Sequence, residues 1–247
     1  MPAAYHTLMQ SGLDHIFVGK SRKQFSIHKA LRSSFPKRAL EPKMIKAVDE
    51  EVFGRCCEFV YSGDYSVPPP ITKSSKNDDL QGRDIETRTQ KVAKRWDPSH
   101  LTWNIFSPKG LSQNYDRLLQ KLDHPPRSKF VRELNNDPFT SYAAVFLSHA
   151  EIYCFGIKTG WRSLAALSAY RLLRLLEDFT LFEERTEDIV QLLEFVFEDS
   201  EHMIDLETLL REYIIWNVEM MMRNVDFRDF LERNPMLEQT VFRAMWE

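Results

Sequence analysis

The sequence predicts an α+β protein in which a small sheet is flanked by helices and a longer helical region follows. Residues 16–18 are a short apolar run and residues 25–27 alternate apolar and polar, and the polar turn 19–23 separates them, as in a β-hairpin. Apolar residues between Val52 and Val60 then recur at spacings of three and four, which places them on one helical face. From residue 142 onward the same helical spacing continues. These three observations define the fold class.

The composition is that of a globular protein large enough to bury a core. The chain has 247 residues, of which 43% are hydrophobic and 28% are charged. No apolar run approaches the roughly 20 residues of a membrane-spanning helix, and the N-terminus lacks the features of a signal peptide. Three cysteines are too few for a disulfide framework. We therefore expect a cytoplasmic or nuclear protein with reduced thiols and no membrane association.

Charge is distributed unevenly along the chain. Nine basic and two acidic residues lie between Met1 and Lys46, whereas nineteen acidic and six basic residues follow from Glu177 onward. Such polarity can steer association with a partner or with another copy. The basic end is compatible with nucleic-acid binding, but its cations are spread over a strand, a turn and a helix. A solvated surface is the preferred interpretation, and nucleic acid is not expected as a partner.

The first unit covers residues 5–67. It opens with a short helix that ends at Ser11-Gly12, and the predicted hairpin follows. A further helix is expected to begin at Ala30, and Pro36 interrupts it. The amphipathic helix then ends in the turn at Gly63-Asp64. This unit contains all the predicted strands.

Residues 68–141 have a different composition. They begin with three prolines, and residues 73–91 include only two aliphatic side chains, so ordering entropy outweighs burial and we predict partial disorder. A group of aromatic and apolar residues follows. It is either a docking segment for a partner or a strap over the chain's own core, and we favour the strap because exposed aromatic side chains are costly. The group consists of Trp96, Trp103, Ile105, Phe106 and Tyr115.

Residues 142–247 are predicted to form a stack of antiparallel helices. One helix covers about residues 163–176, and a second begins at Thr186, a residue type that often caps a helix N-terminus. A long helix is expected over about residues 206–223. Its Met220, Met221 and Met222 are interpreted either as an adaptable partner groove or as core filling.

Several segments resemble the BTB/POZ domain, a fold that joins proteins to other proteins. The resemblance covers residues 5–67 and about 142–224, and the long insertion between them is similar to that of stand-alone BTB proteins of filamentous fungi. The most specific segment is FVYSGDY at residues 59–65. The other matching segments are residues 14–18 (DHIFV), 25–31 (FSIHKAL), 48–53 (VDEEVF), 150–160 (AEIYCFGIKTG) and 184–190 (ERTEDIV).

The resemblance implies a BTB/POZ-like fold and a non-enzymatic interaction function. Residues 5–67 would be the N-terminal part of the domain, 68–141 an insertion and 142–247 a C-terminal helical region. The expected partners are proteins, either a second copy in a homodimer or a different chain, bound through the first helix and strand. The predicted partner-binding residues are Leu8, Met9, Leu13, Ile16, Phe17 and Val18.

Two alternative functions follow from the same segments: a cullin-3 ubiquitin-ligase substrate adaptor and a transcription-associated factor. The region 38–48 is shorter than in the family, and Met44-Ile45 is interpreted as the remnant of a third strand. The loop that contacts cullin-3 in the family is reduced to Leu40-Glu41, which weighs against cullin-3 binding. A shortened sheet also leaves a strand edge open to another chain.

The sequence predicts no catalytic, cofactor-binding or metal site. It contains no GxGxxG, P-loop, HExxH or GxSxG motif. His28 lies beside a predicted strand without the further groups that a catalytic base or metal ligand needs, and we interpret it as a structural hydrogen-bonding residue. Cys56, Cys57 and Cys154 are interpreted as unreactive core thiols.

Overall fold

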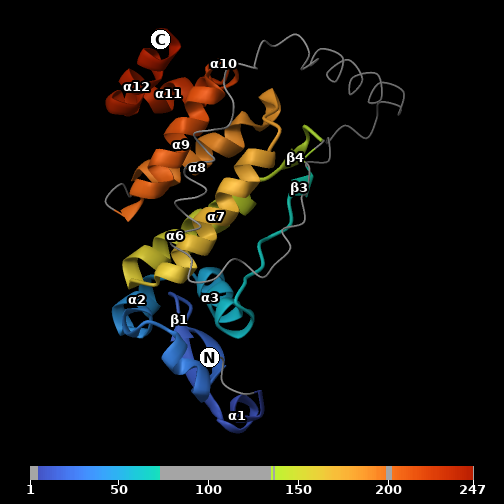
Figure 1. Cartoon of the computed structure of the whole chain (residues 1–247), viewed down its shortest axis with the longest axis vertical. Helices are drawn as coiled ribbons and strands as arrows, with labels where there is room; N and C mark the ends of the chain where they lie inside the picture. The colour runs from blue at the N-terminus through green and yellow to red at the C-terminus, as the bar shows by residue number, and fades with distance from the viewer. Residues whose placement is uncertain (1–4, 73–134, 136, 199–201, 247) are drawn as a thin grey trace, which may run out of the picture.

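The structure, a computed structural model, describes residues 5–72, 135, 137–198 and 202–246 (Figure 1). Within these ranges helices are combined with two small antiparallel sheets, which confirms the α+β class. The aromatic group predicted between residues 96 and 115, and most of the insertion, lie outside the described residues. In the part of the chain that the structure describes, every helix is too short or too polar to cross a membrane.

The N-terminal unit begins with helix α1 (Tyr5–Gln10), followed by the strands β1 (Leu13–Val18) and β2 (Lys23–His28). The two strands form the predicted antiparallel hairpin, with Leu13 opposite His28 and Val18 opposite Lys23. The hairpin is the whole of this sheet, so β1 and β2 are both edge strands. The predicted opening helix and hairpin are therefore present.

Short helical segments connect the hairpin to the next long helix. The 3-10 helices η1 (Lys29–Ser34) and η2 (Lys37–Leu40) stand on either side of Pro36, as the predicted interruption requires. Helix α2 (Pro42–Ala47) follows. It contains Met44-Ile45, so the prediction of a strand remnant at these residues was wrong. Pro42 provides the reason, because its fixed φ favours the first turn of a helix.

Helix α3 (Glu50–Ser62) has a defined signal at each end. The Asp49 side chain accepts a hydrogen bond from the Glu51 N–H (2.8 Å), and Gly63 ends the helix in the left-handed conformation with φ of 79°. Beyond this turn the chain reaches β3 (Ile71–Thr72), which pairs antiparallel with β4 (Thr140–Ser141). This pairing brings the two ends of the insertion together.

The C-terminal region is helical, as predicted. Asn217 divides the long helix expected over residues 206–223: its φ of −109° and ψ of 15° depart from helical values, and its side-chain amide donates to the Tyr213 carbonyl (2.9 Å). Thr186 is not the expected N-cap: it has helical backbone angles, and its hydroxyl donates to the Phe182 carbonyl. Met221 is fully buried, which favours core filling. The elements are α6 (Ala143–Thr159), α7 (Arg162–Asp178), η5 (Glu183–Arg185), α8 (Thr186–Glu198), α9 (Ile204–Trp216), α10 (Val218–Met221), α11 (Val225–Arg233) and α12 (Pro235–Trp246).

The N-terminal unit and the helical region share a hydrophobic core. Figure 1 shows α2 and α3 at one end of the α6–α7 pair, with α11 and α12 toward the opposite end of the molecule. Trp161 contacts Phe35 and Phe59, with ring centroids 5.3 and 5.6 Å apart. This aromatic packing joins α3 and the segment after η1 to the turn between α6 and α7. The shared core includes Ile16, Val18, Ile27, Phe35, Phe53, Ile152, Phe155, Trp161 and Leu164.

Gly156 allows close approach of α6 to α7. A Cβ atom at this position would lie 3.0 Å from both the Cβ and the backbone nitrogen of Ala165. We expect Gly156→Ala to force the helices apart and to lower the free energy of unfolding by roughly 1–3 kcal/mol, measured by urea denaturation. Gly54→Ala is the matched control, because a Cβ there meets Phe25 at an ordinary 3.5 Å. Equal losses in the two variants would contradict the steric explanation.

Candidate functional site

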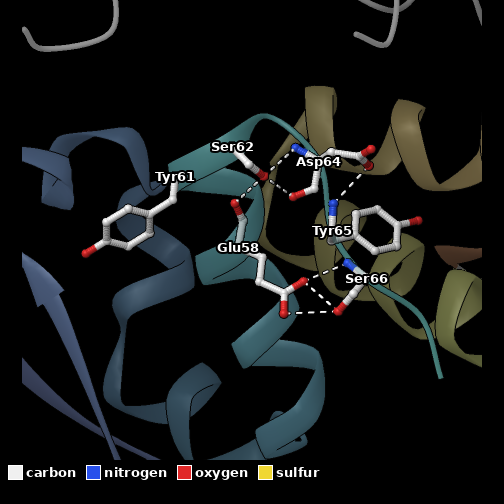
Figure 2. Close-up of a pocket in the computed structure, with 6 residues that line it drawn as sticks. All are labelled: Glu58, Tyr61, Ser62, Asp64, Tyr65 and Ser66. Carbon is white, nitrogen blue, oxygen red and sulfur yellow. Dashed lines mark hydrogen bonds between the residues drawn. The ribbon is translucent and has the colours of Figure 1, made fainter. Parts of the chain in front are cut away.

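A shallow hollow of about 490 Å³ lies where α3 ends (Figure 2). Its polar groups bond to one another. The Glu58 carboxylate accepts from the Ser66 N–H (2.6 Å) and hydroxyl, while the Ser62 hydroxyl donates to the Glu58 carbonyl (2.8 Å). The Asp64 carboxylate accepts from the Tyr65 N–H (2.9 Å). These contacts shape the turn after α3. The hollow is lined by Glu58, Tyr61, Ser62, Asp64, Tyr65 and Ser66.

Behind the hollow, a buried polar cluster joins the N-terminal unit to α6 and α7. The Tyr65 hydroxyl lies 2.7 Å from His149 Nδ1. Arg171 donates to the Asp64 carboxylate (2.9 Å) and to the Tyr65 carbonyl, and its guanidinium lies 4.6 Å from the Tyr65 ring centroid. Burial lowers the pKa of His149 well below its ordinary value, and the charges of Arg171 and Arg55 add to this effect. Neutral His149 therefore serves as a structural partner for Tyr65.

The cysteines and His28 have the structural environments that the sequence predicted. Cys56 and Cys154 are buried, and Cys57 is half-buried. Burial raises the pKa of Cys57 to about 12, so little of the reactive thiolate is present near neutral pH. His28 Nδ1 lies 2.8 Å from the Tyr61 hydroxyl, which confirms its hydrogen-bonding role. Among the described residues, no group of three or more His, Cys, Asp or Glu side chains is arranged to hold a metal ion.

The outer face of the hairpin carries exposed apolar side chains. Alternate residues of a strand point to opposite faces, so Leu13 and Phe17 of β1 share one face. Leu13 is 48% exposed and Phe17 is 49% exposed, and Met9 of the neighbouring α1 is 57% exposed. Leu8 is half-buried. These side chains form the main exposed apolar feature of the N-terminal unit.

Two of the predicted partner-binding residues do not lie on this surface. Ile16 is 7% exposed and Val18 is 0% exposed, because both belong to the opposite face of β1 and pack in the shared core. Including them was wrong: the prediction treated the apolar run as one surface and did not apply the two-residue period of a strand. That period would have separated Leu13 and Phe17 from Ile16 and Val18.

The backbone of β1 also faces outward along one edge between Leu13 and Phe17, and beyond this stretch the Gly19 N–H donates to the Ile45 carbonyl of α2 (2.9 Å). The Lys29 N–H donates to the Gly12 carbonyl (3.0 Å), which makes this a hydrogen-bonded pair of the antiparallel ladder. Because such pairs alternate with non-hydrogen-bonded pairs, the N–H and C=O groups of Leu13, His15 and Phe17 point away from β2. Among the described residues, these backbone groups have no hydrogen-bond partner.

His15 is a further residue of this surface that the sequence analysis missed. It is exposed between Leu13 and Phe17, and its Nδ1 lies 2.9 Å from both the Ser26 hydroxyl and the Gln24 side-chain nitrogen. These contacts hold the imidazole over β2, away from the open edge of β1. We refer to Met9, Leu13, His15 and Phe17, together with this open edge, as the β1 surface.

Comparison with known proteins does not identify this surface. No family model, curated protein or solved structure matches the chain. The BTB/POZ assignment therefore stays a prediction based on sequence segments.

Proposed function

We propose that this chain is a non-enzymatic protein-interaction module of the BTB/POZ type, which self-associates through the β1 surface. The observation that supports this function is the coincidence of exposed Met9, Leu13 and Phe17 with an unpaired strand edge. Contact with another chain removes the apolar side chains from water and pairs the backbone groups. Both contributions favour association of polypeptides.

Electrostatics oppose self-association of this end of the molecule. The cations of the hairpin turn and α2 are exposed, so a dimer formed through β1 brings two basic units together. Salt screens this repulsion, while burial of apolar side chains is not weakened by moderate salt. The dimer is therefore proposed to become tighter as salt rises. Binding of a polyanion would have the opposite salt dependence. The cations are Lys20, Arg22, Lys23, Lys43 and Lys46.

Size-exclusion chromatography with light scattering tests the proposal. We expect the wild type to run at about twice the 29.1 kDa chain mass and Leu13→Asp to run as a monomer, because the carboxylate would be buried in the contact. The matched control is Met236→Asp in α12, which places the same charge at a side chain that is 74% exposed and distant from β1.

A wild type that stays monomeric at high protein and salt concentration would contradict the proposal, as would equal effects of the two aspartate variants. Specific capture of cullin-3 would instead favour the substrate-adaptor alternative. Salt-sensitive retention on DNA would favour the transcription-associated alternative.

A further inference from the structure

We infer that β1 pairs antiparallel with β1 of a second copy of this chain, in the register that places His15 opposite the partner's His15. The inference rests on the proposed self-association and specifies its geometry. It follows from the hydrogen-bond pattern of the hairpin and from the order of side chains along β1.

The open edge of β1 is complementary to a second copy of itself. Leu13, His15 and Phe17 each present one N–H donor and one C=O acceptor along this edge. A two-fold axis beside the strand places each donor of one copy against an acceptor of the other, as an isologous interface requires. Each partly positive N–H group of one edge therefore faces a partly negative C=O group of the other. The two-stranded hairpins become one four-stranded sheet, a more stable arrangement than an isolated hairpin.

The spacing of side chains selects the register. Leu13 and Phe17 lie two residues before and two residues after His15, so a two-fold axis at His15 places Leu13 of each copy opposite the partner's Phe17. In this register Leu13, His15 and Phe17 each lie opposite a residue of the partner's β1. Registers centred on Asp14 or Ile16 pair only two of them. In a register centred on Leu13 or Phe17, one of these three residues lies opposite the partner's β1, and the other two lie opposite residues outside that strand.

A cation adjoins the outer face of the hairpin, because the Arg22 guanidinium lies 5.7 Å from the Phe17 ring centroid. The residues that the two strands place on this face include no lysine, arginine, aspartate or glutamate. Asp14 lies on the other face, where Arg32 contacts its carboxylate at 2.8 Å. Apart from Arg22 beside Phe17, the repulsion between the basic units therefore acts at a distance and not between paired side chains. The outer-face residues are Leu13, His15, Phe17, Gln24, Ser26 and His28.

Cysteine cross-linking in the full chain tests the register. In a hydrogen-bonded antiparallel pair the Cα atoms are about 5.5 Å apart, which is within the range for a disulfide. We expect His15→Cys to form a disulfide-linked dimer under mild oxidation. Leu13→Cys and Phe17→Cys should each stay largely unlinked, whereas an equimolar mixture of the two should cross-link. The wild type is the control for the native thiols, which are buried or half-buried.

His15→Pro provides a second test that does not depend on thiol chemistry. Proline removes the His15 N–H, which points to the open edge and has no partner in the hairpin, so an edge position tolerates it. We expect at least a ~10-fold weaker dimer, with an unchanged far-ultraviolet circular dichroism spectrum showing that the chain still folds.

The outcomes separate the register from the proposed function. In one outcome the wild type is dimeric and Leu13→Asp is monomeric, while His15→Cys forms no disulfide-linked dimer. This result overturns the β1–β1 pairing and leaves the self-association in place. Cross-linking of Leu13→Cys alone as fast as His15→Cys also overturns the register. A monomeric wild type overturns both proposals.

Discussion

Replacing Asp188 by alanine is expected to lower the free energy of unfolding by about 3–5 kcal/mol. Asp188 is 2% exposed, and its carboxylate accepts hydrogen bonds from the Tyr142 N–H (2.7 Å) and the Ser141 hydroxyl (2.9 Å). It also lies 3.8 Å from the buried guanidinium of Arg185. Alanine would leave that cation without its counter-charge and the N–H at the start of α6 without its acceptor. Both losses fall on buried residues.

Urea unfolding of two further variants measures the separate contributions. Asp188→Asn keeps an oxygen acceptor but loses the charge, so its loss should lie between those of the wild type and Asp188→Ala. Glu187→Ala removes the exposed neighbouring carboxylate and should change stability by about 0.5 kcal/mol or less. A loss in Asp188→Ala no larger than that in Glu187→Ala would show that the buried carboxylate is not needed.

Acid is expected to destabilise the protein through His149. The imidazole is buried against Tyr65, and burial together with Arg171 lowers its folded-state pKa well below the ordinary value. In the unfolded chain a histidine titrates near about 6.5, so below that pH the unfolded state takes up a proton that the folded state does not. The free energy of unfolding therefore falls with falling pH, by about 1.4 kcal/mol per unit and about 2 kcal/mol at pH 5.

Unfolding measured at pH 7, 6 and 5 in the wild type and in His149→Gln tests this linkage. Glutamine retains a hydrogen-bonding group for the Tyr65 hydroxyl but cannot be protonated, so this part of the pH dependence should disappear. His6→Gln, at an exposed histidine, should keep the wild-type slope. Equal pH dependence in His149→Gln and the wild type would rule out His149 as the source.

Local signals in the sequence determined much of the secondary structure. An apolar run and an alternating segment on either side of a polar turn predicted the hairpin, and a three-and-four spacing predicted α3. Asp49 and Gly63 mark the ends of α3 through interactions of the adjacent backbone. These features depend on neighbours within a few residues, and such neighbours are visible in a sequence. Leu13 and Phe17 were placed on the candidate surface only as members of the same apolar segment as Ile16 and Val18.

Tertiary packing decided which residues became buried and which stayed exposed. Ile16 and Val18 face the shared core, and Met44-Ile45 forms a turn of α2 where a strand was expected. The roles of His149 and Asp188 depend on partners 84 and 46 residues away, which no local pattern reveals. The open edge of β1 likewise exists because the hairpin forms a sheet of two strands, with α2 bonded at Gly19 beyond the strand. Long-range contacts bury His149 and Asp188, and burial determines how much stability is lost when their partners are removed. The same contacts determine which surface is left exposed for a partner.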